Sequence, residues 1–319
     1  MGNYKKIISP RIQNLCDELK INREDSLNKF WSEIIKNGGP IIEKSEKNSE
    51  DYLVTIVWRE CEPTDKVAVI GEAFGFDTEQ TQLEKLQGTE LWYRTWELNG
   101  STKSLYMFVI NERYEEEWAD LDLRIDPLNP NKYECVEDEK NKGKYYILSK
   151  EQSYVYLPNY KEKDWTIEKD NIPKGKIELI EDFESMVLSN KRRIWIYIPA
   201  GFNEKSNPMG ISVFTDGWEY VHATKVITTL DNLMAEGNIP AMCVIFIDSN
   251  DDRDTELTCS EEFTSFIMDE LLPWVKEKYN INNDESKNLI AGFSYGGLTA
   301  AYIAYKYPQV FSKVLCQSG

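Results

Sequence analysis

The first forty residues carry apolar side chains at helical spacing. Ile12 and Leu15 belong to one such set, and Phe30 belongs to a second. A Gly-Gly-Pro run at 38–40 ends the pattern, because glycine and proline close helices. We therefore predict an N-terminal helical segment over residues 1–40.

Strand-like runs replace the helical pattern after residue 40. β-branched and aromatic residues dominate the stretches 52–58, 66–71, 91–98 and 104–110, and an Asn-Gly turn separates the last two. Closely spaced strands with turns between them predict an all-β sandwich domain, placed at residues 41–135. The polar, proline-punctuated stretch 136–176 is interpreted as an interdomain linker.

Strands and helices alternate from about residue 177. The run 241–248 is nearly continuously apolar, as expected for a strand that is buried on both faces. The alternation predicts an α/β domain over residues 177–319, with a mostly parallel sheet and helices on both faces. The predicted strands are 193–199, 210–217, 241–248, 288–293 and 311–317, and the predicted helices are 223–236, 260–279 and 296–307.

The net charge and the apolar content limit the classes of partner and the location that we expect for this protein. The net charge of −18 argues against a nucleic-acid or anionic-membrane partner, and a small anionic substrate would need a locally basic pocket. The chain start has no apolar stretch typical of a signal peptide, and the longest apolar run, 241–247, is far too short for a membrane span. The six cysteines include no Cys-x-x-Cys pair and are mostly interpreted as buried thiols. We expect a soluble cytoplasmic protein without a metal site.

One sequence motif indicates a candidate catalytic site. The run Gly292-Phe293-Ser294-Tyr295-Gly296-Gly297 fits the G-x-S-x-G nucleophile elbow, with a predicted strand before it and a predicted helix after it. Such a turn strains the serine backbone, and side chains at the flanking positions would collide. Ser294 is the candidate nucleophile, and the backbone N–H of Tyr295 is a candidate oxyanion donor. A Gly-Ser-rich turn without chemistry is the alternative.

A second oxyanion donor is expected from the loop after an earlier strand. In the run Thr215-Asp216-Gly217-Trp218, Gly217 would let the backbone approach the substrate, and the Trp218 N–H is the candidate donor. A plain β-turn is the alternative. His222 is the only histidine in the sequence. Because α/β-hydrolases bring the acid and then the histidine after the nucleophile, we interpret His222 as a helix-start or pocket-rim residue.

The sequence ends at Gly319, on the strand that follows the elbow helix. The two further strands that would supply the triad acid and base are not among these residues, so we expect a fragment, an interrupted protein or an unusual catalytic arrangement. A triad enzyme without its base keeps only the contributions of the oxyanion hole and of binding, a loss on the order of 10⁴ to 10⁶ in rate. We therefore expect little or no activity from the 319 residues alone.

With these motifs in order, the chain resembles the enterochelin (ferric enterobactin) esterases. The resemblance covers most of the sequence and is specific because the short signatures keep their order over two domains. In the first domain, similar to that family's immunoglobulin-like domain, they are residues 57–59, 88–92 and 126–130. In the second, similar to the esterase-D type of α/β-hydrolase, they are residues 192–196, 215–217, 247–248, Arg253, 256–257, Cys259, 270–273, 292–297 and 314–319.

The resemblance implies a serine esterase that hydrolyses the ester bonds of a catechol-bearing trilactone siderophore and releases its iron in the cytoplasm. It implies Ser294 as nucleophile and Tyr295 and Trp218 as oxyanion donors. A substrate-binding stretch containing Arg253 and Glu256 is implied over the active site. No cofactor is implied, since the iron belongs to the substrate.

A ferric siderophore is anionic, so an acidic protein needs a local cation to bind it. Arg253 is the principal candidate. Arg192 and Arg193 are further candidates, but an ion pair or a solvated surface is the preferred interpretation of these two.

Two other functions stay open. One is a different esterase-D activity, such as feruloyl or acetyl ester hydrolysis. The other is a remnant that binds the siderophore without cleaving it, with Trp58, Trp92, Tyr93 and Trp96 as a binding surface. Those aromatic residues are more often sandwich core.

Overall fold

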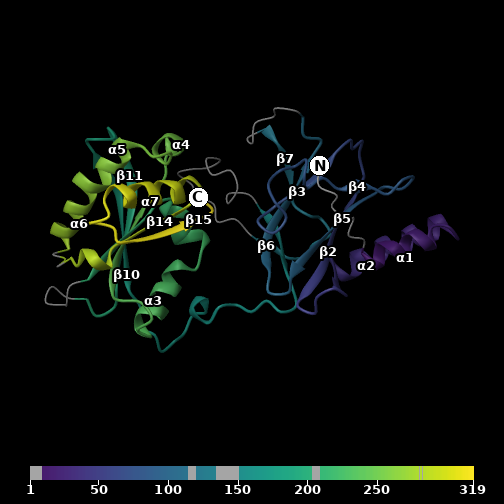
Figure 1. Cartoon of the computed structure of the whole chain (residues 1–319), viewed down its shortest axis with the longest axis horizontal. Helices are drawn as coiled ribbons and strands as arrows, with labels where there is room; N and C mark the ends of the chain where they lie inside the picture. The colour runs from purple at the N-terminus through teal and green to yellow at the C-terminus, as the bar shows by residue number, and fades with distance from the viewer. Residues whose placement is uncertain (1–8, 114–119, 134–150, 203–208, 280, 282) are drawn as a thin grey trace. The chain divides into compact units, whose positions relative to one another are not determined.

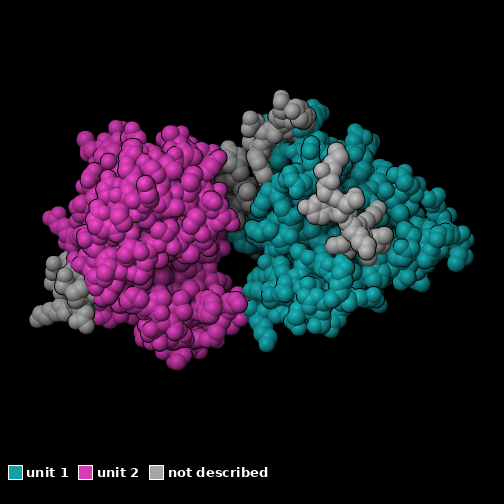
Figure 2. All heavy atoms as spheres, viewed as in Figure 1, with its two compact units in different colours: residues 1–161 teal, residues 162–319 magenta. Residues whose placement is uncertain are grey.

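A computed structural model describes residues 9–113, 120–133, 151–202, 209–279, 281 and 283–319. The chain forms two compact units, residues 1–161 (unit 1) and residues 162–319 (unit 2), which are coloured separately in Figure 2. Many of the helices and strands of both units are labelled in Figure 1. No helix in the described residues is long and apolar enough to cross a membrane.

The N-terminal segment forms the two helices α1 (Pro10–Glu18) and α2 (Arg23–Asn37). The Ser9 hydroxyl accepts a hydrogen bond from the Ile12 N–H at 3.2 Å, which caps α1. The helical prediction is therefore confirmed over the described part of residues 1–40. The helical segment is not a separate domain, because its apolar faces pack on β2 (Asp51–Arg59) and β5 (Leu91–Asn99) of unit 1. The shared core consists of Ile12, Leu15, Phe30, Trp31, Ile34, Val57, Leu91 and Tyr93.

Two antiparallel sheets make up the rest of unit 1. One has the strand order β1-β2-β5-β4, and the other has β3-β6-β9-β8 with β7 beside β6. Val54 of β2 and Phe108 of β6 lie in one buried core between the sheets, so the sandwich prediction is confirmed. The strands are β1 (Ile41–Lys44), β2 (Asp51–Arg59), β3 (Val67–Ile70), β4 (Glu84–Lys85), β5 (Leu91–Asn99), β6 (Lys103–Ile110), β7 (Asp122–Arg124), β8 (Lys132–Tyr133) and β9 (Gln152–Tyr156).

The stretch 136–176 is not a simple linker. Residues 134–150 lie outside the described residues, but β9 pairs with β6 and is therefore a strand of the sandwich. Further on, the Asn232 side chain donates to the carbonyl oxygens of Trp165 and Ile167, both at 2.9 Å, which fastens this part to unit 2. The predicted linker bounds differ from the structure because the five-residue strand β9, which lies between β6 and β8, leaves only a weak sequence pattern.

Unit 2 is built on one six-stranded sheet of order β10-β11-β13-β12-β14-β15. β13, β12, β14 and β15 run parallel to one another, and β11 and β10 add an antiparallel edge next to β13. The mostly parallel prediction is confirmed, although β10 was not predicted. The strands are β10 (Lys176–Ser185), β11 (Asn190–Ile198), β12 (Gly210–Phe214), β13 (Met242–Ile247), β14 (Leu289–Phe293) and β15 (Lys313–Gln317).

Helices cover both faces of this sheet, as predicted. Leu230 of α3 (Val226–Ala235) packs with Phe214 and Phe246 on one face. The other face carries α7 (Tyr295–Lys306) and the helical run made of α5 (Glu261–Ser265), η4 (Phe266–Leu271) and α6 (Leu272–Lys278). Ser260 caps α5 by accepting from the Phe263 N–H at 3.1 Å. The carboxyl ends of the parallel strands therefore meet at one edge of a sheet that is packed on both sides.

The cysteine prediction is only partly right. Cys243 of β13 is fully buried, as expected. Cys61 is exposed, and so is Cys316, because β15 is exposed along its whole length.

Candidate active site

The serine motif forms a sharp turn between a strand and a helix. β14 ends at Phe293, and α7 begins at Tyr295, so Ser294 alone makes the turn. Its backbone lies at φ 52° and ψ −129°, a conformation that costs a non-glycine residue on the order of 1–3 kcal/mol. Ser294 is exposed, and its hydroxyl does not cap α7. This is the backbone geometry expected of a nucleophile elbow.

The flanking glycines are required by close packing. A Cβ atom on Gly292 would lie 2.3 Å from the carbonyl carbon of Gly296. A Cβ atom on Gly296 would lie 2.2 Å from the Thr215 Oγ1 atom and 2.9 Å from Asp216 Oδ2. Neither position has room for a side chain. The motif predicts glycine at both positions for this reason.

Backbone hydrogen bonds hold the elbow between its neighbouring strands. The Ser294 N–H donates to the carbonyl oxygen of Gln317 on β15 at 2.9 Å. On the other side, the Thr215 N–H donates to the carbonyl oxygen of Ala291 on β14 at 3.1 Å. The loop after β12 and the serine turn therefore lie side by side.

The loop after β12 bends sharply, and its glycine packs closely against β13. Asp216 has a φ of 52°, so this loop is strained like the serine turn. A Cβ atom on Gly217 would lie 2.7 Å from the Phe246 carbonyl carbon and 2.9 Å from backbone atoms of Ile247. Gly217 is thus needed for packing against β13, and its role beside a substrate stays a prediction. Trp218 follows directly and leads into the short turn η3 (Glu219–Ala223).

Arg253 lies beside the elbow, held by Asp216. The Arg253 Nε atom donates to Asp216 Oδ1 at 2.6 Å, and Nη2 donates to Oδ2 at 3.0 Å. The Ser249 hydroxyl also donates to Asp216 Oδ1 at 2.6 Å. The guanidinium lies 5.8 Å from the ring centroid of Phe293, the residue before the nucleophile. The Arg253 side chain stays about one-fifth exposed, so one edge of a fixed cation faces solvent near the serine.

Glu256 occupies a different environment from the predicted one. Its carboxylate accepts from Arg192 Nη2 at 2.6 Å and from Arg192 Nη1 at 3.0 Å, and both side chains are buried. The prediction that Glu256 contacts substrate is therefore revised: this carboxylate anchors α4 (Arg253–Glu256) to β11. Arg193 donates to Asp248 Oδ2 at 2.6 Å, so both neighbouring arginines form the expected ion pairs, but Arg192 has no solvated surface.

His222 lies in η3 and is exposed. Its ring centroid is 5.4 Å from that of Trp218 and 5.6 Å from that of Trp195. It therefore lies next to the candidate oxyanion residue, just before α3 begins. This placement agrees with the helix-start interpretation.

The structure adds a residue that the sequence analysis missed. Glu219, directly after Trp218, is only 3% exposed, and its Oε2 atom has no hydrogen-bond partner. Burial raises the pKa of this carboxyl to about 8, helped by the negative charges of Asp216 and Asp248. The sequence gives no signal of this burial, because a glutamate is ordinarily expected at the surface.

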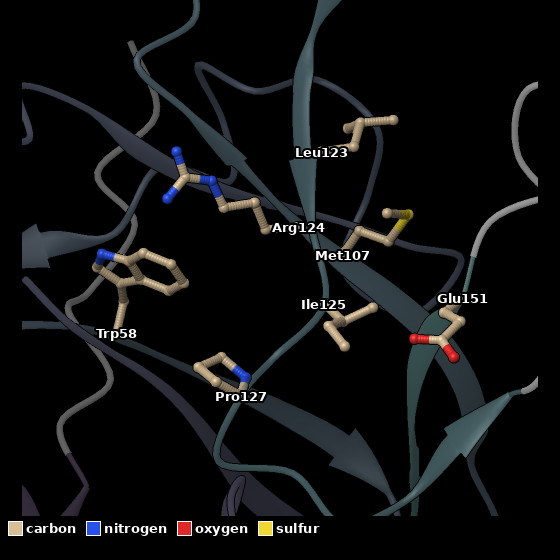
Figure 3. A pocket seen from close by; sticks show the side chains of 7 residues that line it. All are labelled: Trp58, Met107, Leu123, Arg124, Ile125, Pro127 and Glu151. Atoms are coloured by element: carbon tan, nitrogen blue, oxygen red, sulfur yellow. The ribbon is translucent and has the colours of Figure 1, made fainter. Parts of the chain in front are cut away.

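A separate pocket of about 440 Å³ lies in unit 1 (Figure 3). Trp58 lines one side of it and Glu151 another, and Arg124 lies above the Trp58 ring with its guanidinium 6.0 Å from the ring centroid. Trp58 and Trp92 form a cross-strand pair and are largely buried, as is Tyr93. Trp58 and Trp92 therefore belong to the sandwich core, and Tyr93 belongs to the core shared with α1 and α2. None of the candidate active-site residues of unit 2 lines this pocket. Across the described residues, no group of three or more His, Cys, Asp or Glu side chains could hold a metal ion.

A strained serine between a strand and a helix, on a mostly parallel sheet that is covered on both faces, is the arrangement typical of α/β-hydrolases. Residues 185–319 match the family model described as putative esterase. The iron(III) enterobactin esterase of Dickeya dadantii is 24% identical over 322 residues, covering 91% of this chain and 70% of that protein. The iron(III) enterobactin esterase of Escherichia coli O6:H1 is 26% identical over 298 residues, covering 85% and 71%.

A solved structure shows the same fold. The enterobactin esterase of Shigella flexneri, determined in the presence of enterobactin, superimposes with a TM-score of 0.60 at 24% identity, covering 85% of this chain and 71% of that one. The similarity thus extends over both units. The chain is therefore similar to ferric enterobactin (enterochelin) esterases over most of its length.

Proposed function

We propose that this chain is a cytoplasmic serine esterase whose substrate is an anionic, iron-loaded catecholate siderophore of the enterobactin type. The observation that carries the proposal is the Ser294 backbone at φ 52° and ψ −129° between β14 and α7. The substrate class is inferred from relatives that are named iron(III) enterobactin esterases and that match 85–91% of this chain. The proposal also assigns the sandwich of unit 1 to the immunoglobulin-like type.

The roles follow from the positions at the sheet edge. The Ser294 hydroxyl attacks an ester carbonyl, and the N–H groups of Tyr295 and Trp218 stabilise the resulting oxyanion. Collapse of this intermediate releases an alcohol and leaves an acyl-enzyme, which water hydrolyses. The amide of Ser294 itself plays no part in the oxyanion hole, because it donates to Gln317. The proposal assigns no triad acid or base within the 319 residues.

Arg253 is the proposed cationic contact for the catecholate. Asp216 fixes two of its nitrogen atoms, so the guanidinium loses little conformational freedom when an anion binds at its exposed edge. Arg192 and Arg193 are less suited to this role, since their side chains are only 1% and 11% exposed, against 21% for Arg253.

The test combines turnover with binding. Purified protein and the Ser294→Ala variant are incubated with iron(III) enterobactin, the products are separated by chromatography, and binding is followed by tryptophan fluorescence. We expect both proteins to bind with similar affinity and any hydrolysis to be lost in Ser294→Ala. Hydrolysis that survives the substitution would overturn the nucleophile, and absence of binding would overturn the substrate class.

Two further comparisons separate the alternatives. A feruloyl sugar ester hydrolysed faster than the catecholate trilactone would indicate a different esterase-D activity. Tight binding of the siderophore without any turnover would indicate a binding function.

A further inference from the structure

A cluster of buried charges lies next to the elbow and contains one more carboxyl than it has cations. Asp216 pairs with Arg253, and Asp248 pairs with Arg193, both at 2.6 Å. Glu219 is the additional carboxyl. It is buried, and one of its oxygen atoms has no hydrogen-bond partner.

The surroundings of Glu219 disfavour its charged form. The charges that act on it are those of Asp216 in the loop after β12, Asp248 at the end of β13, and Arg253 in α4. The two nearby carboxylates oppose ionisation, while Arg253 is already engaged by Asp216 in a two-point contact. Tyr220, the next residue along η3, donates its hydroxyl to the Gln317 side chain at 2.5 Å and so points to a different partner. A protonated Glu219 leaves the cluster electrically neutral, whereas an ionised one makes it negative.

We propose that Glu219 is a specificity-determining residue that holds a proton at neutral pH. Loss of this proton lowers the affinity of the site for anionic ligands. The inference rests on the proposed function, because the ligand is the anionic siderophore that Arg253 contacts. With Glu219 neutral, the exposed edge of Arg253 attracts the ligand. With Glu219 ionised, the added buried charge repels the ligand and competes with Asp216 for the guanidinium.

The first test measures binding against pH. The dissociation constant of iron(III) enterobactin is determined by tryptophan fluorescence between pH 6 and about 9.5, a range that brackets the Glu219 pKa of about 8. We expect binding by the unaltered protein to weaken about tenfold across this range, equivalent to one pKa unit of coupling between the carboxylate and the ligand. The Glu219→Gln variant, which has the same shape but no charge, should keep a constant affinity. Glu277→Gln, the same change at an exposed position of α6, should follow the unaltered protein. An equal loss of affinity in Glu219→Gln would overturn the inference.

The second test reads the proton on Glu219 without any ligand. Urea unfolding of unit 2 is measured for the unaltered protein and Glu219→Gln over the same pH range. A stability advantage of the variant that grows between pH 6 and about 8 supports a buried, protonated carboxyl, and a constant difference overturns it. If neither protein binds the siderophore at any pH, the proposed function and the ligand part of this inference both fail, while the unfolding data still decide whether Glu219 holds a proton.

Discussion

Replacing Arg192 by methionine is expected to destabilise unit 2 strongly. Arg192 makes a two-point contact with Glu256, and the side chains are only 1% and 8% exposed. Its guanidinium also packs 5.1 Å from the ring centroid of Phe266 and 5.7 Å from that of Phe263. Methionine preserves most of this apolar packing but leaves the Glu256 carboxylate buried without its partner.

The magnitude follows from the uncompensated charge. Breaking a buried pair by removing one partner costs about 3–5 kcal/mol, because the remaining charge has lost both water and its counter-ion. Replacing both partners by apolar residues removes this penalty, so Arg192→Met combined with Glu256→Leu should lie within about 2 kcal/mol of the unaltered protein. The double variant should therefore be more stable than the single one.

Urea unfolding, followed by circular dichroism and tryptophan fluorescence, measures these differences. The two units need not unfold together, so the transitions of the protein should be fitted separately. Lys191→Met is the matched control, because Lys191 and Glu184 are more than half exposed at 3.8 Å and their pair should contribute at most about 1 kcal/mol. A cost below 1 kcal/mol for Arg192→Met, or a double variant less stable than the single, would refute this reasoning.

Three further predictions concern the elbow, a helix cap and pH. Gly296→Ala should abolish any Ser294-dependent hydrolysis, because its Cβ would lie 2.2 Å from Thr215 Oγ1 and displace the turn; a product assay that finds normal turnover would contradict this. Ser260→Ala should lower the stability of unit 2 by about 1 kcal/mol through loss of the α5 cap, measurable as a shift of the urea midpoint, and an unchanged midpoint would contradict it. Between pH 4.5 and about 8 the folded state keeps the Glu219 proton that the unfolded chain has released, so stability should fall with rising pH by at most about 1.4 kcal/mol per unit relative to Glu219→Gln; parallel stability profiles would contradict this.

Elements with strong local patterns could be predicted from the sequence. The strands β12, β13 and β14 are buried and almost wholly apolar, and the elbow has its residues side by side in the chain. β10 was missed because it is an edge strand whose apolar residues Ile177 and Leu179 stay 39% and 40% exposed. Local pattern is thus informative where burial is continuous and weak where a strand lies at the edge.

The electrostatics of the site could not be predicted in this way. Asp216 and Arg253 are 37 positions apart, and their pairing depends on how the loops after β12 and β13 fold together. Glu219 would ordinarily be assigned to the surface, since carboxylates are rarely buried without a partner. Only the tertiary structure shows that Arg192, and not a substrate, is the partner of Glu256.

Because the Ser294 amide donates a hydrogen bond to Gln317, its rate of hydrogen exchange reports local motion at the site. This amide is protected from exchange with solvent as long as β15 stays docked on β14. β15 is exposed along its length, and exposed edge strands open more readily than central ones. The exchange rate at the nucleophile therefore measures how often the sheet edge frays, and each opening releases the backbone that holds the serine in its strained conformation.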